Sequence, residues 1–142
     1  SIIVGFPQET DEEFQELLNF IKEIEFVRLG AFLYSKEEET KAYYFKGHVH
    51  YKTKKKRFDR IMLAQREIAC DLNKTLLGKV RPVMIDGKDE NDEDLFLARL
   101  EQDAPEVDGI VYVRSKKRLA LGEIHKVKII DTWEYDLVAE LL

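Results

Sequence analysis

The first 35 residues combine two short apolar runs with one amphipathic segment. The β-branched run SIIV predicts a strand over residues 1–4. Thr10 and Glu13 have the spacing of a capping box, in which each side chain satisfies a free backbone amide, so a helix should begin there. After this cap, apolar residues recur every three or four positions, at Phe14, Leu17, Leu18, Ile21 and Ile24. The run FVRLGAFLYS at 26–35 predicts a second strand, buried on both faces as in a parallel sheet. We therefore expect a β-α-β unit.

Such a unit leaves much of its apolar surface in water, so we expect the rest of a longer chain to complete it. A second helix should follow, with one face formed by Phe58, Ile61, Met62, Gln65, Ile68, Ala69, Leu72 and Leu76. The basic run KTKKKR at residues 52–57 precedes this face. We expect the run to be the solvated N-terminal flank of the helix, and phosphate binding is the alternative.

After residue 76 the pattern changes to short strands separated by turns. Five segments at roughly ten-residue intervals predict strands, at 78–87, 95–102, 109–115, 124–131 and 133–142. In the fourth segment His125, Val127 and Ile129 should face inward, opposite Lys126 and Lys128. The fold expected is α/β followed by all-β, with a small five-stranded antiparallel barrel as the second part. We place the domains at residues 1–75 and 76–142.

Composition excludes several classes of protein. The chain is 44% apolar and 36% charged with few glycines and prolines, which is typical of folded rather than low-complexity chains. No apolar run approaches the roughly 20 residues of a membrane span, and no signal peptide is evident, so we expect a cytoplasmic protein without membrane contact. The single cysteine, Cys70, excludes a disulfide framework and cannot by itself hold a metal or an iron–sulfur cluster. His48 and His50 lack a third ligand nearby, so no metal site is expected.

Charge is divided unevenly between the two parts. Residues 1–75 carry 13 basic and 13 acidic side chains, whereas residues 76–142 carry 10 and 15, so the net charge of −5 lies in the barrel. An acidic barrel is a poor polyanion binder, and a basic protein partner would suit it better. The barrel's aromatic residues are expected in the core or in cross-strand pairs, with a base-stacking platform as the alternative: Phe96, Tyr112, Trp133 and Tyr135.

Four stretches resemble the radical S-adenosylmethionine methylthiotransferases. They are IIVGFPQET, LGAFLYSKEEETKA, QREIACDLNKTLLGKV and DAPEVDGIVYV, and the resemblance to the C-terminal half of these enzymes covers essentially the whole chain. The family's GFPGET motif is present at residues 5–10 with Gln8 in place of glycine. Its YSxEEGTxA motif is present at residues 34–42 with Glu39 in place of glycine. Because glycine reaches positive φ freely, both departures concern loop conformation and leave the strands unaffected.

The resemblance implies a fold and a cofactor site. The first part would be the end of a partial, TIM-like β/α barrel, and the second a TRAM domain, an OB-like β-barrel that engages the substrate. S-adenosylmethionine would lie at the C-terminal strand ends, against Gly5, Phe6, Glu9, Leu33, Tyr34 and Ser35. Phe6 would be an apolar wall, and main-chain groups near Leu33 and Tyr34 would bind the adenine edge. The parent protein would also hold two [4Fe-4S] clusters, one through a CxxxCxxC motif that this chain lacks, so we expect no cluster here and no activity from the chain alone.

The run DAPEVDG at residues 103–109 resembles the RimO-type branch, whose members methylthiolate an aspartate of a small-subunit ribosomal protein. It supplies three substrate-binding candidates, Asp103, Glu106 and Asp108. The tRNA-modifying branch, the MiaB type, usually lacks this run and has more basic TRAM domains. Pattern and charge both favour the basic ribosomal protein as partner. A tRNA methylthiotransferase and a stand-alone, non-catalytic binding module are the alternatives, and no residue of this chain is assigned a catalytic role.

Overall fold

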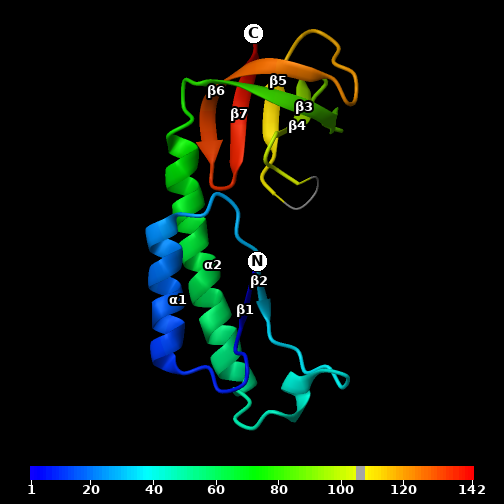
Figure 1. Cartoon of the computed structure of the whole chain (residues 1–142). Coiled ribbons are helices and arrows are strands. Elements are labelled where there is room, and N and C mark those ends of the chain that lie inside the picture. Colours follow the sequence, from blue (N-terminus) through cyan, green and yellow to red (C-terminus); the bar gives the residue numbers. More distant parts are fainter. Residues whose placement is uncertain (105–107) are drawn as a thin grey trace. The chain divides into compact units, whose positions relative to one another are not determined.

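The computed structural model describes residues 1–104 and 108–142, and the chain divides into two compact units, Ser1–Ile68 and Ala69–Leu142. The first contains β1 (Ile2–Val4), α1 (Asp11–Ile24), β2 (Ala31–Leu33) and a 3-10 turn, Lys41–Tyr44 (Figure 1). Helix α2 (Tyr51–Lys74) contains residues of both units. The second continues with β3 (Val80–Lys88), β4 (Leu95–Leu100), β5 (Val111–Arg114), β6 (Ile124–Trp133) and β7 (Asp136–Leu141).

The predicted β-α-β unit is confirmed. Strands β1 and β2 pair in parallel, with Val4 opposite Leu33. The capping box is also present, because the Thr10 hydroxyl accepts from the Glu13 amide and the Glu13 carboxylate accepts from the Thr10 amide at 2.8 Å. The apolar stripe of α1 is buried through Phe14, Leu18 and Ile21. Local side-chain chemistry therefore determines where this helix begins and which face it buries.

The second strand differs from its prediction in length and in burial. It covers Ala31–Leu33 rather than 26–35, and Phe32 is 59% exposed. Its neighbour across the sheet, Ile3, is 57% exposed, whereas Val4 on the opposite face is fully buried. The expectation of burial on both faces is therefore wrong for this chain, because within it the helices cover one side of the two-stranded sheet.

Helix α2 begins earlier than expected. The basic run KTKKKR lies inside α2 rather than in front of it, and its last residue, Arg57, is only 6% exposed. The description of the run as a solvated flank is therefore wrong for Arg57. Further along the helix, Ile61, Ala64 and Ile68 are buried, and Gln65 is buried with its side-chain amide donating to the Phe26 carbonyl at 2.7 Å.

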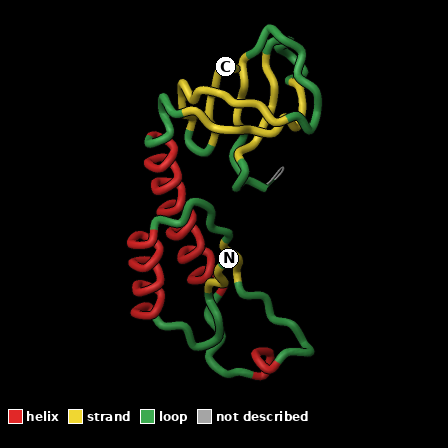
Figure 2. The backbone as a smooth tube through the Cα atoms, turned by 45° about the horizontal axis from the view of Figure 1, so that its top comes forward, coloured by secondary structure: helices red, strands yellow, loops and turns green. Residues whose placement is uncertain are grey.

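The second unit is a closed barrel with the strand order β3-β4-β5-β7-β6, which Figure 2 shows wrapped around one interior. Its core contains Val83, Ile85, Phe96, Ala98, Leu100, Val111, Val113, Val127, Ile129, Leu137 and Ala139. The five predicted strands are all present, but the antiparallel description needs correction, since β5 and β7 pair in parallel. A closed ring with an odd number of strands cannot alternate direction at every step, so one parallel pair is unavoidable.

The predicted alternation along β6 is confirmed for Val127 and Ile129, which are buried, and for Lys126 and Lys128, which are exposed, whereas His125 is only half-buried and contacts Glu123 at 2.9 Å. Of the four aromatic residues, Phe96 lies in the core. Tyr112 and Trp133 lie on either side of β7 with ring centroids 5.8 Å apart, and Trp133 is 57% exposed. These two rings therefore form a pair outside the hydrophobic core.

Candidate functional site

The parallel register brings the ends of β1 and β2 together. The Tyr34 amide donates to the Val4 carbonyl at 2.8 Å, so the residues that follow the two strands are neighbours. The rings of Phe6 and Tyr34 pack edge to face with centroids 5.3 Å apart. The motifs at residues 5–10 and 34–42 are more than twenty residues apart in the sequence, but their first residues are neighbours in the fold. Of the other candidates, Leu33 ends β2 half-buried and Ser35 is exposed.

Aromatic rings surround this junction. Phe6 also contacts Phe45, with centroids 6.1 Å apart, and Tyr34 lies 6.0 Å from the His48 ring. The Phe6 side chain is nevertheless 42% exposed, so part of its ring remains available as an apolar surface. The Tyr34 hydroxyl is buried, and no hydrogen-bond partner for it is found among the described residues. A buried hydroxyl without a partner costs free energy, and a bound polar ligand could supply that partner.

The turn after β1 is closed by a lysine from α2. Gly5 has φ +75°, and a Cβ atom there would lie 2.1 Å from Cγ of Lys54. The Lys54 ammonium donates to the Tyr34 carbonyl at 3.0 Å. The space beside Gly5 that we expected to admit a ligand therefore holds the aliphatic part of Lys54. The Tyr34 main chain likewise has partners for both its amide and its carbonyl within this chain.

Glu9 faces its own turn. Its carboxylate accepts a hydrogen bond from the Gly5 amide at 3.1 Å and one from Arg57 at 2.7 Å. Arg57 also donates to the Glu9 carbonyl at 3.1 Å and to the Asp11 carboxylate at 2.7 Å. Burial opposes the charge of Arg57, but the hydrogen bonds to Asp11 and Glu9 outweigh it and raise the Arg57 pKa. The hydrogen bond from Arg57 holds the Asp11 pKa below its usual value.

Sequence reasoning missed Lys54 and Arg57 as parts of this site. A signal was present, since residues three apart in a helix lie on the same face and these two occupy such positions in KTKKKR. Their exposed neighbour Lys55 pairs instead with Asp59 on the helix surface. The KTKKKR run thus has one face that points into the protein and one that points to solvent, and its composition does not indicate which lysines lie on which face.

The two departures from the family motifs have different consequences. Gln8 has φ +71°, a left-handed conformation that side chains other than glycine rarely adopt. Its amide donates to the Gly47 carbonyl at 2.8 Å and its side chain to the Lys46 carbonyl at 3.2 Å, which hold the residue there. Glu39 is not among the residues with positive φ. The missing glycine therefore matters at position 8 and not at position 39.

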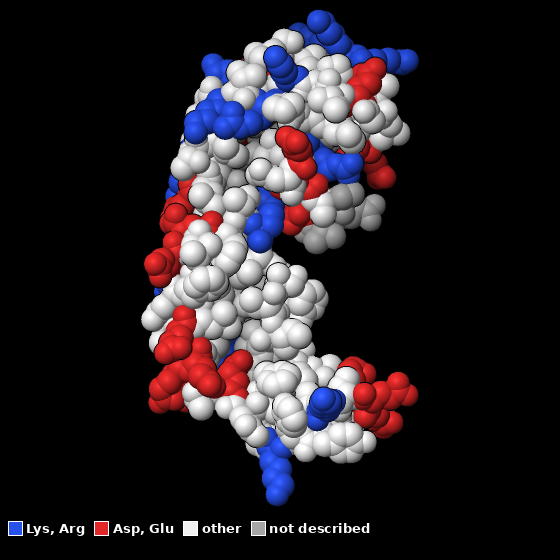
Figure 3. Space-filling model, in the orientation of Figure 1, with Lys and Arg blue, Asp and Glu red and all other residues white. Residues whose placement is uncertain are grey.

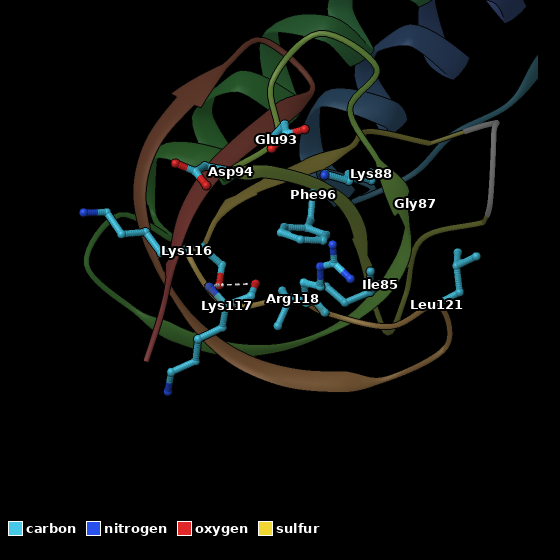
Figure 4. A pocket seen from close by; sticks show the side chains of 12 residues that line it. Ile85, Gly87, Lys88, Glu93, Asp94, Phe96, Lys116, Lys117, Arg118 and Leu121 are labelled. Atoms are coloured by element: carbon cyan, nitrogen blue, oxygen red, sulfur yellow. Dashed lines mark hydrogen bonds between the residues drawn. The ribbon is translucent and has the colours of Figure 1, made fainter.

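A second candidate site lies in the barrel. A pocket of about 490 Å³ has the core residue Phe96 in its lining, together with six charged side chains. Two of them are acidic, Glu93 and Asp94, and four are basic, Lys88, Lys116, Lys117 and Arg118, so positive charge is in excess. In Figure 4, Lys88 and Arg118 point toward the Phe96 ring, while Lys116 and Lys117 extend away from it. The barrel as a whole has a net negative charge, but the surface around this pocket is positively charged.

The substrate-binding candidates of the DAPEVDG run are used partly within the run. Asp103 is buried. The Asp108 carboxylate accepts from the Ala104 amide at 2.7 Å. Glu106 lies outside the described residues. Gly109 sits against the backbone of Tyr135, where a Cβ atom would lie 1.9 Å from the carbonyl oxygen.

Charge is distributed unevenly over the first unit as well. Acidic side chains gather at the N-terminal end of α1, where Asp11, Glu12 and Glu13 form the first turn, whereas the surface over β1 and β2 is largely uncharged (Figure 3).

Within residues 1–104 and 108–142, no group of three or more His, Cys, Asp or Glu side chains is arranged to hold a metal ion. None of the helices described combines the length and apolarity needed to cross a membrane.

Comparisons with known proteins identify relatives for the whole chain. Residues 77–142 match the TRAM domain family. A protein of Caldanaerobacter subterraneus named ribosomal protein uS12 methylthiotransferase RimO is 45% identical over 140 residues, which is 99% of this chain and 31% of that protein. Proteins of the same name from Carboxydothermus hydrogenoformans and Clostridioides difficile are 45% and 41% identical over 142 residues, 100% of this chain and 32% of each protein. The chain thus spans about a third of the length of these relatives.

Proposed function

The chain is related over its whole length to the RimO methylthiotransferases and includes a TRAM domain, and from this premise we propose its function. It forms part of a methylthiotransferase that adds a methylthio group to an aspartate of a small-subunit ribosomal protein. The name of the relatives specifies ribosomal protein uS12, which supports this substrate. The proposal divides the work, since the first unit contributes a wall of the cofactor pocket and the barrel docks the substrate.

The observation that carries the first half of this proposal is the junction of β1 and β2. Their parallel pairing places Phe6 and Tyr34 in contact at the C-terminal strand ends, where β/α barrels bind their ligands. The uncharged face formed by Ile3 and Phe32 would line the interior of the completed barrel. Strands contributed by the rest of the complete protein would pair with the edges of this sheet and cover that face.

The residues at the junction suit S-adenosylmethionine. An adenine ring needs an apolar surface, which the exposed part of Phe6 offers, and polar partners, of which the buried Tyr34 hydroxyl is one. Leu33 and Ser35 continue the same strand end and would complete the contact. Glu9 would act indirectly, because its carboxylate already holds the Gly5 amide and Arg57. When bound, S-adenosylmethionine and the iron–sulfur clusters supply the radical and the sulfur.

The clusters would be held elsewhere in the complete protein. A [4Fe-4S] cluster is held by cysteine thiolates, and this chain has one cysteine, Cys70. The chain by itself would therefore provide one wall of the cofactor pocket and would not perform the reaction. Its contribution would be shape and polarity at the pocket wall.

The barrel's contribution would be recognition of a basic protein. Its excess of acidic side chains favours such a partner electrostatically. The loop that follows β3 carries the acidic residues Asp89, Glu90, Asp92, Glu93 and Asp94. Within the DAPEVDG run Asp103 is buried and Asp108 accepts from the Ala104 amide, so Glu106 is the remaining candidate for direct contact.

The test uses the complete protein that contains this chain. It is purified anaerobically, reconstituted with iron and sulfide, and incubated with S-adenosylmethionine, reductant and either the ribosomal protein or tRNA. Mass spectrometry then measures an added methylthio group. We expect modification of the aspartate and none of the tRNA. Modification of tRNA alone would refute the assigned substrate, and absence of cofactor cleavage would refute the enzyme assignment.

Variants connect this assay to the structure. Phe6→Ala should weaken S-adenosylmethionine binding in equilibrium dialysis, because it removes the exposed ring at the strand end. Phe20→Ala is the matched control, since Phe20 is an exposed phenylalanine on α1 with no position at the strand ends. Equal affinities of the two variants would contradict the placement of the cofactor.

One observation favours the tRNA-modifying alternative. The four cationic side chains around the barrel pocket, Lys88, Lys116, Lys117 and Arg118, could bind phosphates. The two functions differ in salt dependence, because each phosphate contact releases counterions and makes affinity fall steeply as salt rises. Titration of the complete protein with tRNA at several salt concentrations measures this slope directly.

A further inference from the structure

Two cations of α2 contact the turns that follow β1 and β2. We propose that Lys54 and Arg57 are positioning residues that hold the turns after β1 and β2 in the geometry required for S-adenosylmethionine binding. This inference rests on the proposed function for the identity of the ligand. The contacts that support it lie entirely within the first unit and do not depend on any ligand.

Lys54 connects the two turns directly. Its side chain runs along Gly5, close enough that a Cβ atom at Gly5 would lie 2.1 Å from the Lys54 Cγ. Its ammonium then reaches the Tyr34 carbonyl at 3.0 Å and lies 5.7 Å from the centre of the Tyr34 ring. One side chain thus contacts the glycine of the first motif and the tyrosine of the second. A shift of either turn would have to break the charged hydrogen bond or displace the lysine.

Arg57 fixes the first turn through Glu9. Its guanidinium donates to the Glu9 carboxylate at 2.7 Å and to the Glu9 carbonyl at 3.1 Å. The same carboxylate accepts from the Gly5 amide at distances of 3.1 and 3.2 Å. The order of contacts is therefore Arg57 to Glu9 to Gly5, which closes the turn around its glycine. Removing the arginine would leave a largely buried carboxylate with the Gly5 amide as its remaining partner.

Lys54 and Arg57 are held in fixed relation to each other by the helix that carries both. Residues 54 and 57 lie three apart in α2, so they project from the same face and move together with the helix backbone. Further along, Ile61 is buried, and the hydrogen bond from the Gln65 side chain to the Phe26 carbonyl fastens α2 to the segment after α1. Long cationic side chains suit this role because they reach from a helix to main-chain carbonyls, which an apolar side chain cannot bind.

The first experiment measures S-adenosylmethionine affinity in the complete protein by equilibrium dialysis under anaerobic conditions. Lys54→Met keeps most of the aliphatic stem and removes the ammonium, and we expect it to weaken binding about tenfold. Lys54→Arg restores a donor and should recover most of the affinity. Lys56→Met is the matched control, because Lys56 is exposed on the same turn of the helix, and it should bind as the unchanged protein does.

A second measurement separates positioning from general instability. Thermal unfolding of Lys54→Met should resemble that of Lys56→Met, while its affinity for S-adenosylmethionine falls. Parallel losses of thermal stability and affinity, without recovery in Lys54→Arg, would indicate a merely structural lysine and overturn the proposal. Unchanged affinity in Lys54→Met would overturn it as well.

A third measurement holds even if the cofactor assignment fails. Hydrogen exchange of the peptides containing Gly5 and Tyr34 reports the turns themselves, without any ligand. We expect faster exchange at Tyr34 in Lys54→Met and at Gly5 in Arg57→Lys, which loses the two-pronged donor of arginine. Failure of the unchanged protein to bind S-adenosylmethionine would refute the proposed function alone. Unchanged exchange in both variants would refute the positioning roles.

Discussion

Gly109 offers a sharp test of how the barrel is built. It ends the DAPEVDG run and packs directly against the chain after β6. A Cβ atom at this position would lie 1.9 Å from the Tyr135 carbonyl oxygen and 2.8 Å from its carbonyl carbon. Ordinary contact begins at 3.4 Å, so the two backbones would have to separate by about 1.5 Å in the Gly109→Ala variant. Backbone atoms, unlike the end of a flexible side chain, cannot rotate away.

The magnitude follows from the hydrogen bonds beside the contact. The Ile110 amide donates to the Asp136 carboxylate at 2.8 Å, and the Leu137 amide donates to the Ile110 carbonyl at 2.9 Å. A separation of about 1.5 Å breaks both, and each lost bond costs about 1 to 1.5 kcal/mol, with the remainder coming from disturbed packing between β5 and β7. We therefore expect Gly109→Ala to lower the free energy of unfolding by about 3 kcal/mol.

The assay exploits the single tryptophan of the chain. Trp133 lies in β6 beside Tyr112, so its fluorescence follows unfolding of the second unit and not of the first. Guanidinium titrations would compare Gly109→Ala with the unchanged chain. Gly87→Ala is the matched control in the same barrel, because a Cβ atom there meets nothing within 4 Å and its φ is not positive. That variant should lose less than about 0.5 kcal/mol.

Two results would refute this reasoning. Equal unfolding midpoints for Gly109→Ala and Gly87→Ala would mean that the close approach of Gly109 to Tyr135 does not exist in solution. A large loss in Gly87→Ala would mean that any β-carbon added to a barrel glycine destabilises the fold, so the specific contact would not be the cause.

Three further predictions concern charge and backbone strain. Arg57→Met should lower the stability of the first unit by about 3 kcal/mol, measured by helical circular dichroism, and adding Glu9→Gln should recover part of the loss because no largely buried carboxylate is then left without its arginine, whereas the Asp11 carboxylate is exposed to water. Gln8→Val should cost about 1 to 2 kcal/mol in the same assay, whereas Gln8→Gly should be tolerated, since a β-branched residue fits poorly at φ +71°. The hydrogen bond with His125 at 2.9 Å lowers the Glu123 pKa below its usual 4.5, so its stabilising contribution is complete above about pH 4.5 and is lost as pH falls through the lowered pKa. The difference in unfolding midpoint between the unchanged chain and Glu123→Gln should therefore shrink as pH falls below 4.5; a constant difference would contradict this assignment.

The first helix shows which features follow from local sequence. Its start depends on Thr10 and Glu13, three residues apart, and its buried face on apolar residues three or four positions apart. Both features depend on residues spaced three or four positions apart, so they can be predicted from the sequence before the fold is known. The alternating burial along β6 was predictable for the same reason, because a strand exposes successive side chains on opposite faces.

The candidate site was only partly predictable. The motif resemblance predicts that Gly5 and Tyr34 lie at one cofactor pocket, and the parallel register does bring their turns together. It did not indicate that Lys54 would fill the space beside Gly5, nor that Glu9 would turn inward to Arg57. A run of basic residues predicts a charged surface, and which of its members are buried depends on the segments packed against the helix.

The sequence by itself thus determined the helix cap, the apolar faces, the strand count and the family motifs, since each depends on residues close together in the chain or on local pattern. The tertiary structure decided the parallel pair of β5 and β7, the close approach at Gly109 and the contacts of Lys54 and Arg57. These features depend on the path by which distant segments are brought together. The chemistry of a side chain determines which kinds of group it can bind, whereas the packing of distant segments determines which of those groups lie close enough to bind.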